Sequence, residues 1–130
     1  MASYWPSAQA KANDPVIAGK MNSLTKIIFS QTLEKVEWEN SVLSKGDIKD
    51  TVIKLKEQSG KDIVVFGSSS IVSSLTQSGL IDECRVIINP VILGRGKAQF
   101  SGDIDIKKMK LINIRQFGDG VVMLSYQPIQ

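Results

Sequence analysis

The fold of this chain is decided by one stretch, IVVFGSSSIV at residues 63–72. Its first four residues form an unbroken apolar run, which is typical of a strand that is covered on both faces. Gly67 then allows a tight turn, and serine is favoured where a helix begins. The stretch therefore predicts a buried strand over residues 63–66, a turn, and a helix that ends near Gly79.

Two further elements precede this stretch and complete a supersecondary unit. Ile48, Val52 and Leu55 recur at helical spacing with charged residues on the opposite side, which predicts an amphipathic helix. The short apolar run at residues 26–30 predicts a strand. Strand, helix and strand over residues 26–67 then form a βαβ unit, whose crossover is expected to be right-handed.

The ends of the chain carry their own signals. Asp14 and Pro15 have the residue types of a helix N-cap and a first helical residue, whereas residues 1–12 are expected to be irregular. Asp-Gly between two apolar runs is a strong hairpin signal. Downstream we expect a strand, a glycine-rich loop and a C-terminal hairpin, at residues 84–89, 90–102 and 109–126. The chain is therefore predicted to be one α/β domain over residues 1–130, with a mainly parallel sheet and an antiparallel edge.

Composition limits the chemistry that this domain can perform. The 130 residues are 42% hydrophobic and 22% charged, with one Cys and no His. Without His there is no Ser-His-Asp triad, no Cys-His dyad and no His-ligated metal, and one Cys excludes zinc fingers and iron–sulfur clusters. We therefore expect no metal site, and chemistry that uses carboxylates, hydroxyls, cations, main-chain groups or a borrowed cofactor.

Charge and targeting signals favour a cytoplasmic protein with no nucleic-acid or membrane partner. The net charge is +3 and the basic residues are scattered, so we expect no nucleic-acid partner. No stretch approaches the roughly 18 apolar residues of a membrane span, and the start lacks the pattern of a signal peptide. The unpaired Cys84 suits a reducing compartment.

The first candidate site is the turn at Gly67, Ser68, Ser69 and Ser70. A glycine after a buried strand, followed by hydroxyls at the positive end of a helix, suits a phosphate or pyrophosphate. Serine is equally a common helix cap, so a purely structural turn is the alternative. Neither the dinucleotide fingerprint GxGxxG nor a P-loop is present.

The second and third candidates are weaker. Ser30, Gln31 and Thr32 follow the strand over residues 26–30 and could hydrogen-bond a second phosphate or a ribose, although polar residues there are more typical of an ordinary loop. Arg95 lies between two glycines and could contact an anion, although glycine for turn geometry explains this loop as well.

The remaining side chains that could carry chemistry are expected to have structural roles instead. Cys84 is expected to be a small core residue, because no base accompanies it. Trp5 and Trp38 are expected to anchor packing. Asp82 and Glu83 are adjacent and point apart, so they do not form an acid–base dyad.

The chain carries the motifs SYWP at 3–6, MN at 21–22, KIIFSQTL at 26–33 with Trp38, IVVFGSSSIV at 63–72, LIDE at 80–83, and NPVILGRGK at 89–97 with Phe100. Taken together, these motifs resemble the dihydrofolate-reductase-like family, and within it the branch that shares the reductase domain of bacterial riboflavin biosynthesis. The resemblance covers nearly the whole chain.

The resemblance implies a three-layer α/β fold and an NADPH-dependent reductase, in which the cofactor supplies hydride and the protein supplies placement. It implies that the pyrophosphate of the cofactor lies on Gly67, Ser68, Ser69, Ser70 and Ile71, and its 2′-phosphate on Ser30, Gln31 and Thr32. The family commonly has Gly in place of Ser68, and often Arg in place of Gln31. The second departure removes a charge suited to the 2′-phosphate, so NADH is also possible. The resemblance assigns no catalytic acid or base.

Relative to the family, the usual first strand and the substrate loop would precede Met1. Loss of that strand would expose strand edges, so we expect a homo-oligomer, a dimer. Alternatively the remaining strands close up, or the chain is part of a longer protein. The function expected is hydride transfer from NADPH to a small heterocyclic or carbonyl substrate. The alternative is a non-catalytic nucleotide-binding or oligomerising remnant of such a reductase.

Overall fold

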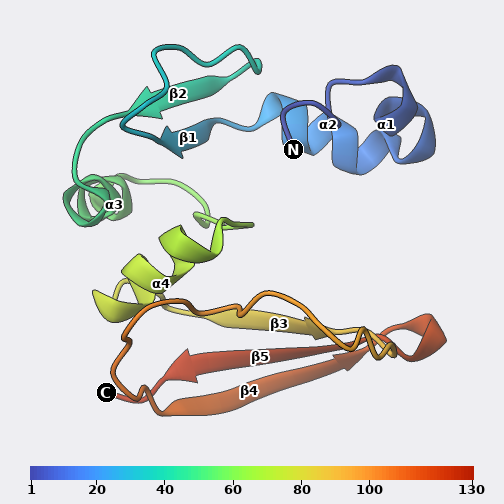
Figure 1. Cartoon of the computed structure of the whole chain (residues 1–130), viewed down its shortest axis with the longest axis vertical. Coiled ribbons are helices and arrows are strands. Elements are labelled where there is room, and N and C mark those ends of the chain that lie inside the picture. Colours follow the sequence, from blue (N-terminus) through green and yellow to red (C-terminus); the bar gives the residue numbers. More distant parts are fainter. The chain divides into compact units, whose positions relative to one another are not determined.

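The computed structural model describes residues 1–130 and divides them into two compact units, Met1–Asp47 and Ile48–Gln130 (Figure 1). The prediction of a single domain stays a prediction. The first unit contains α1 (Ala8–Asn13), α2 (Pro15–Ser23), β1 (Lys26–Phe29) and β2 (Ser41–Ser44). The second contains α3 (Ile48–Glu57), α4 (Ser69–Gln77), β3 (Cys84–Ile88), β4 (Met109–Gln116), the 3-10 turn η1 (Gly118–Gly120) and β5 (Val122–Pro128).

Side-chain caps begin the first two helices. The Asp14 carboxylate accepts a hydrogen bond of 3.3 Å from the Ile17 N–H, and Pro15 is the first residue of α2, which confirms that predicted start. Residues 1–12 are not wholly irregular as expected, because α1 forms there. The Ser7 hydroxyl caps this helix by accepting from the Ala10 N–H at 3.2 Å, and alanine has the highest helix propensity.

A small packed centre holds the rest of the first unit to α2. Trp38 Nε1 donates to Asn22 Oδ1 at 2.8 Å, and Asn22 Nδ2 donates to the Trp5 carbonyl at 2.9 Å. The Lys26 ammonium lies 4.6 Å from the centre of the Trp38 ring and donates to the carbonyl of Met21 at 2.9 Å, near the end of α2. The Trp38 side chain therefore anchors packing, as predicted, whereas Trp5 joins this centre through its main-chain carbonyl.

The first sheet is the parallel pair of β1 and β2. The two strands pair from Lys26 opposite Ser41 to Phe29 opposite Ser44. The strand predicted at residues 26–30 is thus confirmed, but its partner is β2, which the sequence did not reveal. Its four residues include only two apolar ones, Val42 and Leu43, too short a run to distinguish from a loop.

The predicted strand over residues 63–66 is not formed, and the expected βαβ unit over residues 26–67 is therefore wrong. No strand pairs with this segment. Ile63, Val64 and Phe66 are 52%, 61% and 68% exposed instead of covered on both faces. Local apolarity makes a segment suitable for a strand, but the strand forms only when a neighbour satisfies its backbone hydrogen bonds.

The second sheet is antiparallel, with the strand order β3-β5-β4 (Figure 1). Cys84 pairs with Tyr126 and Ile88 with Val122, while β4 and β5 form the predicted hairpin. Asp119 adopts the left-handed φ of 64° that its turn requires. The α/β class is confirmed, but the sheet is not mainly parallel, because only β1 and β2 pair in that sense.

The core of the second unit gathers around α4. Leu75 of α4 and Val52 of α3 are buried, and these two helices pack on each other. Ser73, on the same helix, is buried and accepts a hydrogen bond of 2.8 Å from the Ser101 N–H. This bond attaches the long segment between β3 and β4 to α4. None of the helices in the structure combines the length and the apolarity that crossing a membrane requires.

Candidate functional site

The turn at Gly67 leads directly into α4. Gly67 has a φ of +141°, a conformation that side-chain-bearing residues rarely adopt, and its peptide bond to Ser68 is cis. A Cβ added at Gly67 would meet nothing within 4 Å. The space beside this glycine is therefore open to a ligand that approaches the backbone closely.

The N-terminus of α4 lacks a side-chain cap. Ser68 occupies the N-cap position, but its hydroxyl lies 2.7 Å from the Ser70 hydroxyl and makes no capping bond. The first helical bond runs from the Val72 N–H to the Ser68 carbonyl, and no acidic side chain lies in the first turn. The N–H groups of Ser69, Ser70 and Ile71 thus have no intrahelical acceptor. Such a terminus binds anions, because its N–H groups and its dipole both favour negative charge.

A cavity of about 340 Å³ adjoins this turn, and two of its lining residues were not predicted. Arg85, from β3, and Gln99, from the following segment, line it together with Gly67 and Ser69. Arg85 Nε donates to Glu83 Oε1 at 2.6 Å, and this hydrogen bond raises the pKa of the guanidinium further. Arg85 therefore remains a cation beside the turn at Gly67. Its position depends on the pairing of β3 with β5, which sequence spacing does not reveal.

The loop after β1 holds its predicted site residues in local hydrogen bonds. The Ser30 hydroxyl accepts from the N–H groups of Thr32 and Leu33, at 3.3 and 3.1 Å. The Gln31 side chain donates to the Lys45 carbonyl at 3.0 Å. These bonds fix the loop geometry, as the alternative interpretation expects, while Gln31 and Thr32 remain exposed.

Lys45 is the cation that sequence reasoning missed at this loop. Its ammonium donates to the Gln31 carbonyl at 3.3 Å, so the residues that follow β1 and β2 are linked in both directions. They meet because β1 and β2 are parallel and end at the same edge of their sheet. Lys45 therefore supplies positive charge beside Gln31.

The two groups of predicted cofactor residues belong to different units. Residues 30–32 lie in the first, and residues 67–71 lie in the second. The predicted βαβ unit would bring both groups to one edge of a sheet, but residues 63–66 form no strand. Each group is therefore a candidate site on its own evidence.

The other side chains considered in the sequence, Asp82, Glu83, Cys84 and Arg95, form no second site with one another. Asp82 pairs with Lys56 at 2.6 Å and Glu83 with Arg85 at 2.6 Å, so these two carboxylates do not form a dyad, as predicted. Burial raises the pKa of the Cys84 thiol, which keeps it protonated at neutral pH. Arg95 is exposed, in a loop where every residue from 91 to 100 is exposed.

A family model described as the RibD C-terminal domain matches residues 1–123. Among curated proteins, Bacillus subtilis YyaP, which is uncharacterised, is 37% identical over 126 residues, covering 95% of this chain. Uncharacterised B. subtilis YwjB is 25% identical over 97 residues, or 75% of this chain. The chain spans 65% and 56% of the lengths of these two relatives.

Two solved structures share the fold. The first is a protein assigned to riboflavin biosynthesis from Shewanella sp. PV-4, with a TM-score of 0.72 and 20% identity over 92% of this chain and 71% of that one. The second is a pyrimidine reductase-like protein from Corynebacterium diphtheriae, with a TM-score of 0.60 and 16% identity over 80% of this chain and 50% of that one. At these identities the likeness concerns the fold.

Proposed function

The chain belongs to the RibD C-terminal domain family, and from that premise we propose that it is a reductase that takes hydride from NADPH. The observation that carries the proposal is the uncapped N-terminus of α4 beside the open space at Gly67. The acceptor in this proposal is a small heterocyclic or carbonyl compound, and the location is cytoplasmic.

The residues present at this turn fit the pyrophosphate of a nicotinamide cofactor. The N–H groups of Ser69, Ser70 and Ile71 would donate to its oxygens, and Arg85 would add a positive charge from the wall of the adjoining cavity. The absence of a side chain on Gly67 would let the phosphates approach the backbone. When bound, the cofactor supplies the hydride, while the chain positions it and neutralises its charge.

Binding and turnover can be tested together on the unmodified chain. We expect NADPH to quench tryptophan fluorescence or shift amide NMR signals saturably, and its absorbance to fall when a suitable pterin, pyrimidine ribosyl compound or quinone is added. Absence of binding at millimolar NADPH would overturn the proposal. Binding without oxidation over the panel would favour the alternative, a non-catalytic nucleotide-binding remnant.

We also propose, on evidence separate from the turn at Gly67, that the loop after β1 and the neighbouring Lys45 recognise the 2′-phosphate of NADPH, and a substitution at Lys45 tests this. In Lys45→Ala, we expect NADPH binding to weaken about fivefold, since one exposed charge contact to a phosphate contributes roughly 1 kcal/mol. NADH lacks the 2′-phosphate, so its affinity should stay within about twofold of the original value. The measurement is the pair of dissociation constants for each protein. Equal weakening of both cofactors would show that Lys45 does not recognise the 2′-phosphate.

We also propose that the chain forms a homodimer. The apolar segment over residues 63–66 is largely exposed and pairs with no strand, which makes it a ready surface for association. Light scattering should give the mass of a dimer. A monomer at high concentration would contradict this.

A further inference from the structure

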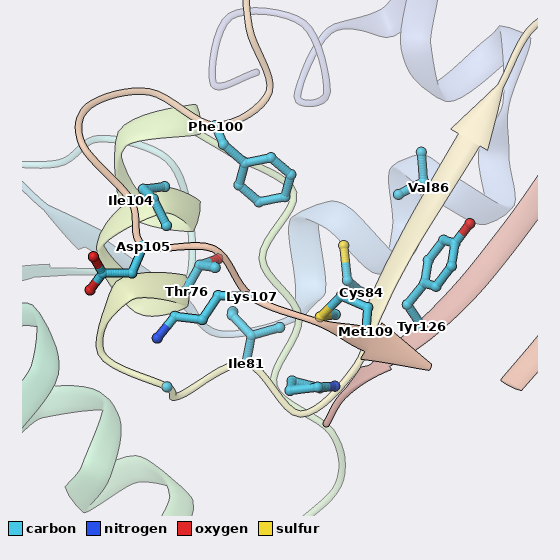
Figure 2. A pocket seen from close by; sticks show the side chains of 12 residues that line it. Thr76, Ile81, Cys84, Val86, Phe100, Ile104, Asp105, Lys107, Met109 and Tyr126 are labelled. Atoms are coloured by element: carbon cyan, nitrogen blue, oxygen red, sulfur yellow. The ribbon is translucent and has the colours of Figure 1, made fainter. Parts of the chain in front are cut away.

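A second cavity lies in the second unit and shares no lining residue with the one at Gly67 (Figure 2). Its volume is about 440 Å³, within the range of sites that hold small molecules. The walls come from the end of α4, from the β-sheet, and from the segment between β3 and β4.

Hydrogen bonds at two points attach the segment between β3 and β4, which forms one wall of this cavity, to α4. The Ser101 N–H donates to the Ser73 hydroxyl at 2.8 Å. One turn further along, Gln77 and Asp105 bond reciprocally, because the Asp105 N–H donates to Gln77 Oε1 at 3.2 Å and Gln77 Nε2 donates to Asp105 Oδ2 at 3.1 Å. The wall is thus fixed at two points without a ligand, which lowers the cost of ordering it when a ligand binds.

The lining combines aromatic rings with soft, polarisable sulfur. Phe100 and Tyr126 contribute rings, and Cys84 and Met109 contribute sulfur atoms. Thr76, a polar lining residue, already donates its hydroxyl proton to the Val72 carbonyl at 2.7 Å. The charged ends of Asp105 and Lys107 point away from the two rings (Figure 2).

From this lining we infer that the cavity is a binding site for an uncharged, flat aromatic or fused-ring molecule. Aromatic rings and thioether sulfur make favourable contacts with such a molecule. Charged ligands are disfavoured, because the lining offers few groups that could replace their hydration. Water molecules find few hydrogen-bond partners in an apolar lining. An apolar ligand, by contrast, makes dispersion contacts with the lining side chains.

This inference does not rest on the proposed reductase function. The cofactor candidate lies at the N-terminus of α4, whereas this cavity adjoins the C-terminal part of the same helix. Saturating NADPH is therefore expected to leave occupancy of the second cavity unchanged.

The uncharged fluorophore N-phenyl-1-naphthylamine is a suitable probe for the full chain. We expect saturable binding of one probe per chain, with an increase in its fluorescence. Cys84 provides a second readout, because it is the only cysteine and lines the cavity. Saturation with the probe should slow the reaction of Cys84 with dithiodipyridine, at constant pH, by about tenfold or more, since a thiol reacts only when accessible.

A matched pair of variants distinguishes binding of the probe in the cavity from its adsorption to exposed apolar side chains elsewhere on the chain. Ile104→Phe adds volume to the cavity wall and should weaken probe binding about tenfold, whereas Ile92→Phe makes the same change at a side chain that is 100% exposed and should not alter it. Circular dichroism checks that both variants fold.

Three results would overturn the inference. The first is the absence of saturable binding, and the second is displacement of the probe by NADPH. The third is binding that leaves the reactivity of Cys84 unchanged, which would mean that the probe adsorbs to the exposed apolar surface. The protection measurement needs no variant, so it decides the question even if Ile104→Phe does not fold.

Discussion

Ser69→Asp is expected to abolish most cofactor binding while leaving the fold at least as stable. Ser69 is the first residue of α4 and lines the cavity beside Gly67. The carboxylate that Ser69→Asp introduces would therefore face the proposed pyrophosphate. Placing like charges against each other costs several kcal/mol, and a loss of about 2–3 kcal/mol corresponds to roughly 30- to 150-fold weaker binding. A carboxylate in the first turn favours the helix itself, by about 0.3–1 kcal/mol.

The opposite signs of these two effects make the result specific. General damage to the turn would lower both the affinity and the free energy of unfolding, whereas an anion site predicts that only the affinity falls. The measurements are the NADPH dissociation constant and the urea midpoint of the same protein.

Ser69→Asn is the matched control for charge. Asparagine has nearly the shape of aspartate but no charge, and we expect its effect on NADPH affinity to stay within about fivefold, the cost of a modest steric change. If the two variants bind NADPH equally well, the negative charge is irrelevant and the turn does not hold a phosphate.

Local signals in the sequence predicted the helices better than the sheets. The start of α2 follows from Asp14 and Pro15, and α3 follows from the spacing of Ile48, Val52 and Leu55. The terminal hairpin follows from its Asp-Gly turn. In each case the deciding interactions lie within a few residues of each other, so the sequence alone contains them.

Strand pairing could not be predicted in the same way, because a pairing partner is a distant part of the chain. Residues 63–66 have strong strand propensity but find no partner, whereas β2 has weak propensity and pairs with β1 throughout its length. Propensity reports how well a segment fits a sheet, and tertiary context decides whether the sheet exists.

The residues of the candidate site likewise fall into those that local sequence predicts and those that depend on distant parts of the chain. The turn at Gly67 could be predicted, because glycine and the serines that follow act locally at the start of α4. Arg85 and Lys45 could not be predicted. Arg85 reaches the turn through the packing of β3, and Lys45 reaches Gln31 through the pairing of β1 with β2.

Leu75→Ala is expected to cause the largest loss of stability, and it also tests whether the chain is one domain. Leu75 is only 3% exposed, on the helix around which the second unit packs. Truncating a buried leucine removes its transfer free energy and leaves a cavity, which should lower the free energy of unfolding by about 2–4 kcal/mol. Ile92→Ala is the control, since its side chain is 100% exposed and its truncation should cost less than about 0.5 kcal/mol.

Unfolding of Leu75→Ala followed by two different probes tests whether the chain is a single domain. Trp5 and Trp38 both lie in the first unit, so tryptophan fluorescence reports on residues 1–47, whereas far-UV circular dichroism reports on the whole chain. In a single cooperative domain, a change at Leu75 lowers the urea midpoint by the same amount with both probes. We expect that coincidence. If only the dichroism midpoint moves, the two units unfold independently and the single-domain prediction is wrong. If neither midpoint moves, burial of the Leu75 side chain does not stabilise the chain.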